Sequence, residues 1–181
     1  MALAIFKRIP PWGRVLQVYA VGAVVVYSWT LLWFFWKLPS LIDFLNLGEI
    51  LSAFAYLLTV NFVESLLVLV APLLLSLILP QKWFCDQFIA RGAGLVLAVT
   101  GYLIILAFQF QTINGYPDIF LKTWSVAFAA ALIAVIVFLV GRFVVLRNAL
   151  EALADRTTIF LYLTIPLSLI ALLAVGIRQV I

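Results

Sequence analysis

The chain has 181 residues and a net charge of +4; 67% of its residues are hydrophobic, 10% are charged, and its mean hydropathy is +1.28. Because a soluble domain of this size carries about 25% charged residues, we expect an all-α integral membrane protein. The absence of histidine removes the commonest ligand for haem and zinc and the commonest general base. The single cysteine, Cys85, excludes an internal disulfide and a C-x-x-C redox pair.

Five apolar stretches are long enough to cross a bilayer as helices, which takes about 20 residues. They are residues 15–36, 49–79, 92–110, 120–141 and 157–177. Two shorter amphipathic stretches, about 40–46 and 142–155, are predicted to be helices at the membrane interface. For the second of these, a dock for a partner is the alternative. We expect residues 1–181 to form a single polytopic membrane domain.

Tryptophans mark one face of the first span. Trp29, Trp33 and Trp36 follow one another at i, i+4 and i+7, so a helix places them on the same side. The ordinary interpretation is an aromatic belt at the membrane interface. The alternative is an aromatic face that binds a lipid, a quinone or a carotenoid.

The second span begins with a capping-box pattern. Asn46 and Glu49 are three residues apart at the start of the apolar run, and the run then continues to Leu79 with only Pro72 inside it. At ~1.5 Å per residue this helix is about 50 Å long, against ~30 Å of hydrocarbon. It must therefore tilt, bend or extend beyond the bilayer, and Pro72 leaves the carbonyl of Val68 without its helical donor.

Polar groups gather near the middle of this second span. Asn61, Ser65 and Pro72 share one face of the helix and Glu64 lies at its edge, so these four residues form a candidate polar site inside the membrane. An ionised carboxylate in hydrocarbon costs on the order of 3 kcal/mol or more, so Glu64 should face protein or water, or hold a proton. We expect neighbouring helices to shelter it from lipid. The site either binds an ion, a proton or a polar head group, or forms hydrogen bonds that fix helix packing.

Small residues indicate close helix packing in the third and fourth spans. Ala90, Gly94, Ala98 and Gly101 follow one another at spacings of four, four and three, a stripe that lets another backbone approach. The fourth span has a small-residue face that could pack on this stripe. That face consists of Ala127, Ala130, Ala131, Ala134 and Gly141.

Basic residues are unevenly divided between the two sides that five alternating spans define. One side carries eight, namely Lys7, Arg8, Arg14, Lys82, Arg91, Arg142, Arg147 and Arg156. The other side carries three, namely Lys37, Lys122 and Arg178. The richer side is predicted to be cytoplasmic, which puts the N-terminus inside and the C-terminus outside.

The sequence contains no phosphate-binding loop, dinucleotide fingerprint, nucleophile elbow or cluster of metal ligands. We therefore expect no catalytic residue, no cofactor, no metal and no nucleic-acid partner. The predicted partners are the lipid bilayer and other membrane subunits, identical or different. We expect a multi-pass protein of a cell membrane, with the prokaryotic plasma membrane as the favoured location.

Three functions remain open, and the favoured one is a non-enzymatic accessory or scaffolding subunit of a larger membrane complex. The alternative is an oligomeric ion- or proton-coupled transporter or channel that uses Glu64 on the proline-kinked second span. Five spans with an outward C-terminus are also similar, in topology alone, to the membrane domain of lipid head-group transferases of the sulfatase-like superfamily. That similarity implies a second alternative, a membrane platform for an extracytoplasmic enzyme that modifies lipid head groups.

Overall fold

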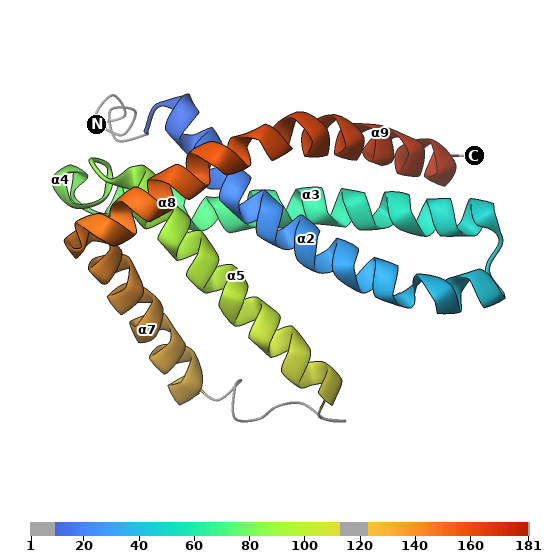
Figure 1. Cartoon of the computed structure of the whole chain (residues 1–181), viewed down its shortest axis with the longest axis horizontal. Helices are drawn as coiled ribbons and strands as arrows, with labels where there is room; N and C mark the ends of the chain where they lie inside the picture. The colour runs from blue at the N-terminus through green and yellow to red at the C-terminus, as the bar shows by residue number, and fades with distance from the viewer. Residues whose placement is uncertain (1–9, 113–122, 181) are drawn as a thin grey trace.

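The computed structural model describes residues 10–112 and 123–180, and within these ranges the regular structure is entirely helical (Figure 1). The helices are α2 (Trp12–Phe44), α3 (Leu47–Ile78), α4 (Gln81–Phe84), α5 (Phe88–Thr112), α7 (Thr123–Arg142), α8 (Val144–Thr157), the 3-10 turn η1 (Thr158–Phe160) and α9 (Leu161–Val180). Five helical segments are long and apolar enough to cross a membrane. The predicted all-helical architecture with five candidate spans is confirmed. The predicted start of the fourth span, 120–122, lies outside the described residues.

Helix α2 is longer than predicted. The prediction of a separate interfacial helix at about 40–46 is wrong. The helix runs without interruption through Pro39 to Phe44, and its end is marked by Leu45, which is extended. Proline removes only the bond to the carbonyl four residues earlier, and its φ suits a helix, so one Pro need not end it. Leu41 continues the side of α2 that faces Leu57 of α3, which favours extending the same helix.

The capping box predicted at the start of α3 is present. The side chain of Asn46 accepts a hydrogen bond from Glu49 N at 3.0 Å, and Glu49 Oε2 accepts one from Asn46 N at 2.9 Å. These reciprocal bonds satisfy backbone donors that the first turn would otherwise leave free. Helix α3 then continues for 32 residues with Pro72 inside it.

Three long helices meet where Gly92 leaves room for its neighbours. A β-carbon at Gly92 would lie 3.0 Å from Val18 of α2 and 3.7 Å from Pro72 of α3. Val18 and Pro72 are both fully buried. The glycine thus lets α5 approach α2 and α3 closely at this level.

The second predicted amphipathic segment is a helix, α8. Leu150 and Ala154 pack against Val21 of α2 and Ala93 of α5. The chain then turns through η1 directly into α9, which packs on α3 (Figure 1). The location of α8 at a membrane surface stays a prediction.

Arg91, near the start of α5, is held by its neighbours. Its guanidinium donates to the Trp83 carbonyl and to Gln87 Oε1, and it lies 4.7 Å from the centre of the Trp83 ring. A β-carbon on Gly141 of α7 would overlap this guanidinium. The absence of a side chain at Gly141 is therefore what allows the end of α7 to pack on Arg91.

These contacts bring several helix ends together at one end of the molecule. The N-terminal parts of α2 and α5, the C-terminal end of α7 and helix α8 all lie there (Figure 1). Arg14 donates to the Cys85 carbonyl at 3.5 Å, and Gln17 lies 3.5 Å from Asp155. The distribution of Lys and Arg residues along the sequence predicts that these helix ends lie on the same side of the membrane. Which side is cytoplasmic stays a prediction.

Away from this end the helices diverge. Helices α5 and α7 run at a wide angle to α3 and α9 (Figure 1), and a groove lies between α2, α3 and α5. Helix α7 has 20 residues, or about 30 Å, and α3 has 32, or about 48 Å. An α3 that spans the bilayer must therefore tilt or extend beyond it, and Phe44 and Leu47 at the turn beside Leu45 are exposed.

We predict that Gly141→Ala destabilises the protein, because the added methyl group must displace the Arg91 guanidinium and the packing of α7 on α5. Overpacking of this kind costs about 1–3 kcal/mol. The measurement is thermal unfolding of the purified protein, followed by circular dichroism. Gly101→Ala is the matched control, since nothing lies within 4 Å of a β-carbon there. Equal effects of the two substitutions would contradict this account of Gly141.

Candidate functional site

Three side-chain hydrogen bonds join α2 to α3 and α9 inside the bundle. They are Asn61 Nδ2 to Thr30 Oγ1 at 2.5 Å, Tyr19 with Ser65 at 3.1 Å, and Tyr27 with Ser168 at 2.6 Å. All three use a hydroxyl group of α2. Membrane helices associate without the help of water, so such bonds fix the rotation and register of the helices they join.

For two of these bonds the donor and the acceptor can be assigned, because the hydroxyl group on one side already donates its single proton elsewhere. Ser65 Oγ donates to the Phe62 carbonyl at 2.8 Å, so its lone pair is free to accept from the Tyr19 hydroxyl. Thr30 Oγ1 likewise donates to the Val26 carbonyl at 2.9 Å and accepts from Asn61. These polar groups are satisfied within the bundle.

Two members of the predicted polar site therefore serve packing. Asn61 and Ser65 are each 1% exposed and face α2. Pro72 is also buried, at the contact of α2, α3 and α5. The structure does not bring these three residues together with Glu64 as one site.

Glu64 lies on a different side of α3. At ~100° per residue it is about 60° around the helix from Asn61 and about 100° from Ser65. It lines a groove of about 440 Å³ between α2, α3 and α5. The groove residues are Val25, Val26, Trp29, Thr30, Glu64, Leu67, Val68, Thr100, Leu103, Ile104 and Ala107.

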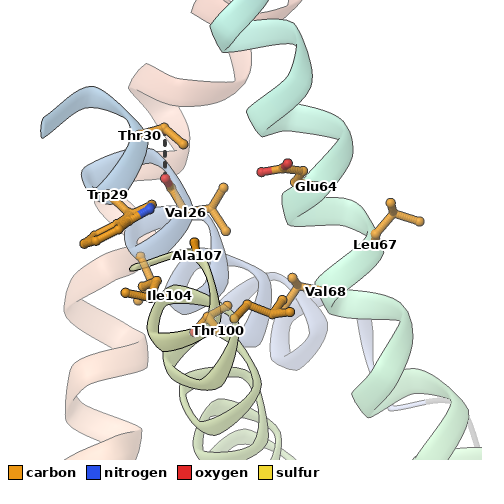
Figure 2. A pocket seen from close by; sticks show the side chains of 11 residues that line it. Val26, Trp29, Thr30, Glu64, Leu67, Val68, Thr100, Ile104 and Ala107 are labelled. Carbon is orange, nitrogen blue, oxygen red and sulfur yellow. Dashed lines mark hydrogen bonds between the residues drawn. The ribbon is translucent and has the colours of Figure 1, made fainter. Parts of the chain in front are cut away.

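The carboxylate of Glu64 points from α3 toward α2 across this groove (Figure 2). Among the residues that the structure describes, none forms a hydrogen bond or an ion pair with it. Its side chain is exposed within the groove, and the expectation that neighbouring helices shelter Glu64 from lipid stays a prediction. The physical reason for the exposure is the divergence of α5, which leaves the groove open at this level.

The groove is apolar apart from a few groups. Thr100 is buried and its Oγ1 donates to the Val96 carbonyl at 2.7 Å, so it brings no free donor. Val68, whose carbonyl loses its helical donor to Pro72, lies one turn from Glu64 and also lines the groove. Glu64 is the eighteenth of the 32 residues of α3 and so lies near mid-membrane if α3 spans the bilayer.

Two of the three predicted aromatic residues lie together. The rings of Trp29 and Trp33 meet edge to face, with centres 5.8 Å apart. Lys37 Nζ lies 5.9 Å from the centre of the Trp33 ring, and Trp36 is 78% exposed and apart from this pair. Trp33 Nε1 is buried, and no described group accepts a hydrogen bond from it. Trp29 lines the Glu64 groove as well, so the aromatic pair borders it.

Only the N-terminal part of the small-residue stripe on α5 packs against other helices. Ala90 is fully buried, and a β-carbon at Gly94 would lie 3.2 Å from Val140 of α7. Ala98 is half-buried, and Gly101 has nothing within 4 Å of a β-carbon because it lies where α5 has diverged.

The expectation that the alanine face of α7 packs on this stripe is wrong. The alanines of that face, Ala127, Ala130, Ala131 and Ala134, are exposed. The buried side of α7 carries Ala129, Val137 and Val140 instead. Branched side chains offer more surface for contact between α5 and α7 than alanine does, and Val140 lies against Gly94 of α5.

The residues of α2 that form hydrogen bonds with polar side chains of α3 and α9 were not predicted from the sequence. Tyr19, Tyr27 and Thr30 of α2 lie within ~80° of one another around the helix, a stripe that the sequence contains. Tyrosine is common at membrane interfaces, so the stripe alone does not reveal interior hydrogen bonds. Arg91 was counted only as a loop charge, although it is buried.

No family model, curated protein or solved structure matches the chain. Among the described residues, no group of three or more Cys, Asp or Glu side chains could hold a metal ion. The function is therefore argued from the geometry of the chain itself.

We predict that Tyr27→Phe and Ser168→Ala each destabilise the protein, because each removes the bond between α2 and α9. Hydrogen bonds between membrane helices are worth about 0.6 kcal/mol on average and up to ~1.7. The double variant should lose little more than either single one, since both remove the same bond. Tyr162→Phe is the control, as Tyr162 is 81% exposed. Fully additive losses in unfolding free energy would contradict the pairing.

We predict that Glu64→Gln stabilises the isolated chain in lipid nanodiscs, because it removes a carboxylate that has no internal partner. The gain in unfolding free energy is at most about 3 kcal/mol, the cost of a charge at mid-membrane. Glu49→Gln removes a charge but keeps an acceptor for Asn46 N, so it should leave stability unchanged. A loss of stability in the Glu64 variant would mean that the carboxylate has a stabilising role within the chain.

Proposed function

We propose that the chain is a non-enzymatic accessory or scaffolding subunit of a larger membrane complex. The observation that carries this proposal is the Glu64 groove, which opens sideways between α2, α3 and α5 and presents a carboxylate without a partner in the described chain. A charged group near mid-membrane is stable only when it meets protein or water or loses its charge. A second membrane protein seated in the groove would supply that environment.

The polar groups of α2 and α3 favour this function over transport. A transport path needs polar groups that remain available to a solute near mid-membrane. Here Asn61, Ser65 and Thr30 are occupied by bonds between helices. Among the described lining residues, Glu64, the freed carbonyl of Val68 and the indole N–H of Trp29 remain beside an otherwise apolar groove, which is a poor path for an ion.

The proposal includes a membrane setting. The five spans sit in a cell membrane, with the prokaryotic plasma membrane favoured, and the basic helix ends near Arg14, Arg91 and Arg142 face the cytoplasm. The positive-inside rule supports this sidedness. On the same basis α8 lies near the cytoplasmic surface, and α9 leads outward.

We predict that the chain, purified from its native membrane in a mild detergent, is accompanied by other membrane proteins in fixed proportion. Native mass spectrometry of the purified sample gives the composition. An unrelated five-span protein that carries the same tag, extracted in parallel, identifies chains that adhere to any membrane protein. A stable, lone monomer that retains native lipid would contradict the proposal.

The transporter alternative keeps one supporting observation, the carboxylate of Glu64 one turn from the freed carbonyl of Val68. In that case the parent chain in liposomes would carry an ion or proton flux and Glu64→Gln would abolish it. The subunit proposal predicts no flux from either protein. A flux that depends on Glu64 would replace the subunit proposal with the alternative.

A further inference from the structure

The environment of Glu64 points to a more specific partner, and this step rests on the proposed function. We infer that the groove between α2, α3 and α5 receives a transmembrane helix of a different protein, and that this helix carries a lysine or arginine near mid-membrane, opposite Glu64. This inference rests on the shape of the groove, the charge within it, and the positions of the basic residues along the spans of this chain.

The shape of the groove suits a helix that enters from the side. Its walls diverge because α5 leaves α2 and α3 at an angle (Figure 1). Leu67 on one wall is 64% exposed and Leu103 on the other is 49% exposed.

The charge in the groove selects the chemistry of that helix. Figure 2 shows the Glu64 carboxylate directed into the groove, while Leu67, one turn along, points away from α2. The other lining groups are apolar, apart from the indole N–H of Trp29, or, like Thr30 and Thr100, already occupied by their own hydrogen bonds. A basic side chain would give the carboxylate a charge-assisted hydrogen bond in a medium of low dielectric constant.

A second copy of this chain cannot supply that basic side chain. The Asn61–Thr30 bond sets residue 30 level with residue 61, and therefore residue 27 level with Glu64. Lys37 is ten residues further along α2, or about 15 Å away, which is the edge of a ~30 Å hydrocarbon core. Arg91 is the fourth residue of α5, and Arg142 is the last of α7. The other Lys and Arg residues of the sequence lie outside the middle of the five spans.

A lipid amine is a poorer occupant for the same geometric reason. Head-group nitrogens lie at the bilayer surface, about 15 Å from the midplane, which is half the thickness of the hydrocarbon core. Glu64 has 17 residues of α3 before it and 14 after it, so an α3 that extends about equally beyond both faces of the bilayer puts it far from either surface. A basic residue in a partner helix can sit at that depth, as ionisable residues paired inside membrane bundles do.

The test uses a photo-crosslinking amino acid in the full chain, expressed in its native membrane. The probe replaces Leu103 on one wall of the groove or, as a control, Leu132, which is 52% exposed on α7 outside the groove. We expect the Leu103 probe to label one transmembrane segment that contains a lysine or arginine within about one turn of the labelled residue. We expect no such labelling from the Leu132 probe.

Charge exchange then tests the pairing itself. Glu64→Gln should lower the yield of the Leu103 adduct about tenfold, which corresponds to about 1.4 kcal/mol of lost interaction. Glu64→Lys should abolish the adduct, and replacement of the partner's basic residue by glutamate should restore it. Circular dichroism of each variant confirms that the chain remains folded.

Three results would overturn the inference. They are labelling from Leu103 of lipid alone or of a second copy alone, labelling of a segment without a basic residue, and a yield that Glu64→Gln leaves unchanged. In each case partners that still co-purify would leave the proposed subunit function standing. A chain that purifies without any partner would remove the proposed function as well.

Discussion

The hydroxyl groups of α2 are the feature on which the rest of the structure depends. In hydrocarbon a polar side chain has no water to bind, and lipid gives apolar helices little reason to associate. Tyr19, Tyr27 and Thr30 satisfy polar groups of α3 and α9 and thereby fix the rotation of both helices. Once α3 is held with Asn61 and Ser65 packed on α2, Glu64 lies at the edge of that face and its carboxylate points across the groove toward α2.

Helices α5 and α7 are held to the rest of the bundle by close packing and by Arg91, not by hydroxyl groups. This attachment determines the shape of the groove. Contacts around Gly92 and Arg91 hold these helices at one end of the molecule, through close backbone approach and a buried guanidinium. Toward the other end α5 has no hydrogen bond to α2 or α3 among those described. A second close contact lies at Gly22, where a β-carbon would be 3.0 Å from Val96 of α5. Beyond it α5 diverges, and the opening falls at the level of Glu64.

The sequence predicts the parts of this fold that depend on local pattern. The apolar runs define five candidate spans, and the spacing of Asn46 and Glu49 predicts a capping box that the structure contains. Features that depend on contacts between helices are harder to predict from the sequence. The sequence places Asn61 and Glu64 in one polar site, but the hydroxyls of α2 divide them. A proline at 39 suggests a helix boundary, yet contact with α3 keeps α2 continuous.

The position of Glu64 has a consequence for the stability of the chain before it meets a partner. A mid-membrane carboxylate without an internal partner lowers the stability of the free subunit, and a cation from another helix would offset that cost on assembly. An aliphatic residue at this position would give a more stable free chain and a less selective groove. Under the proposed function, the acid therefore makes the stability of the subunit conditional on assembly with the correct helix.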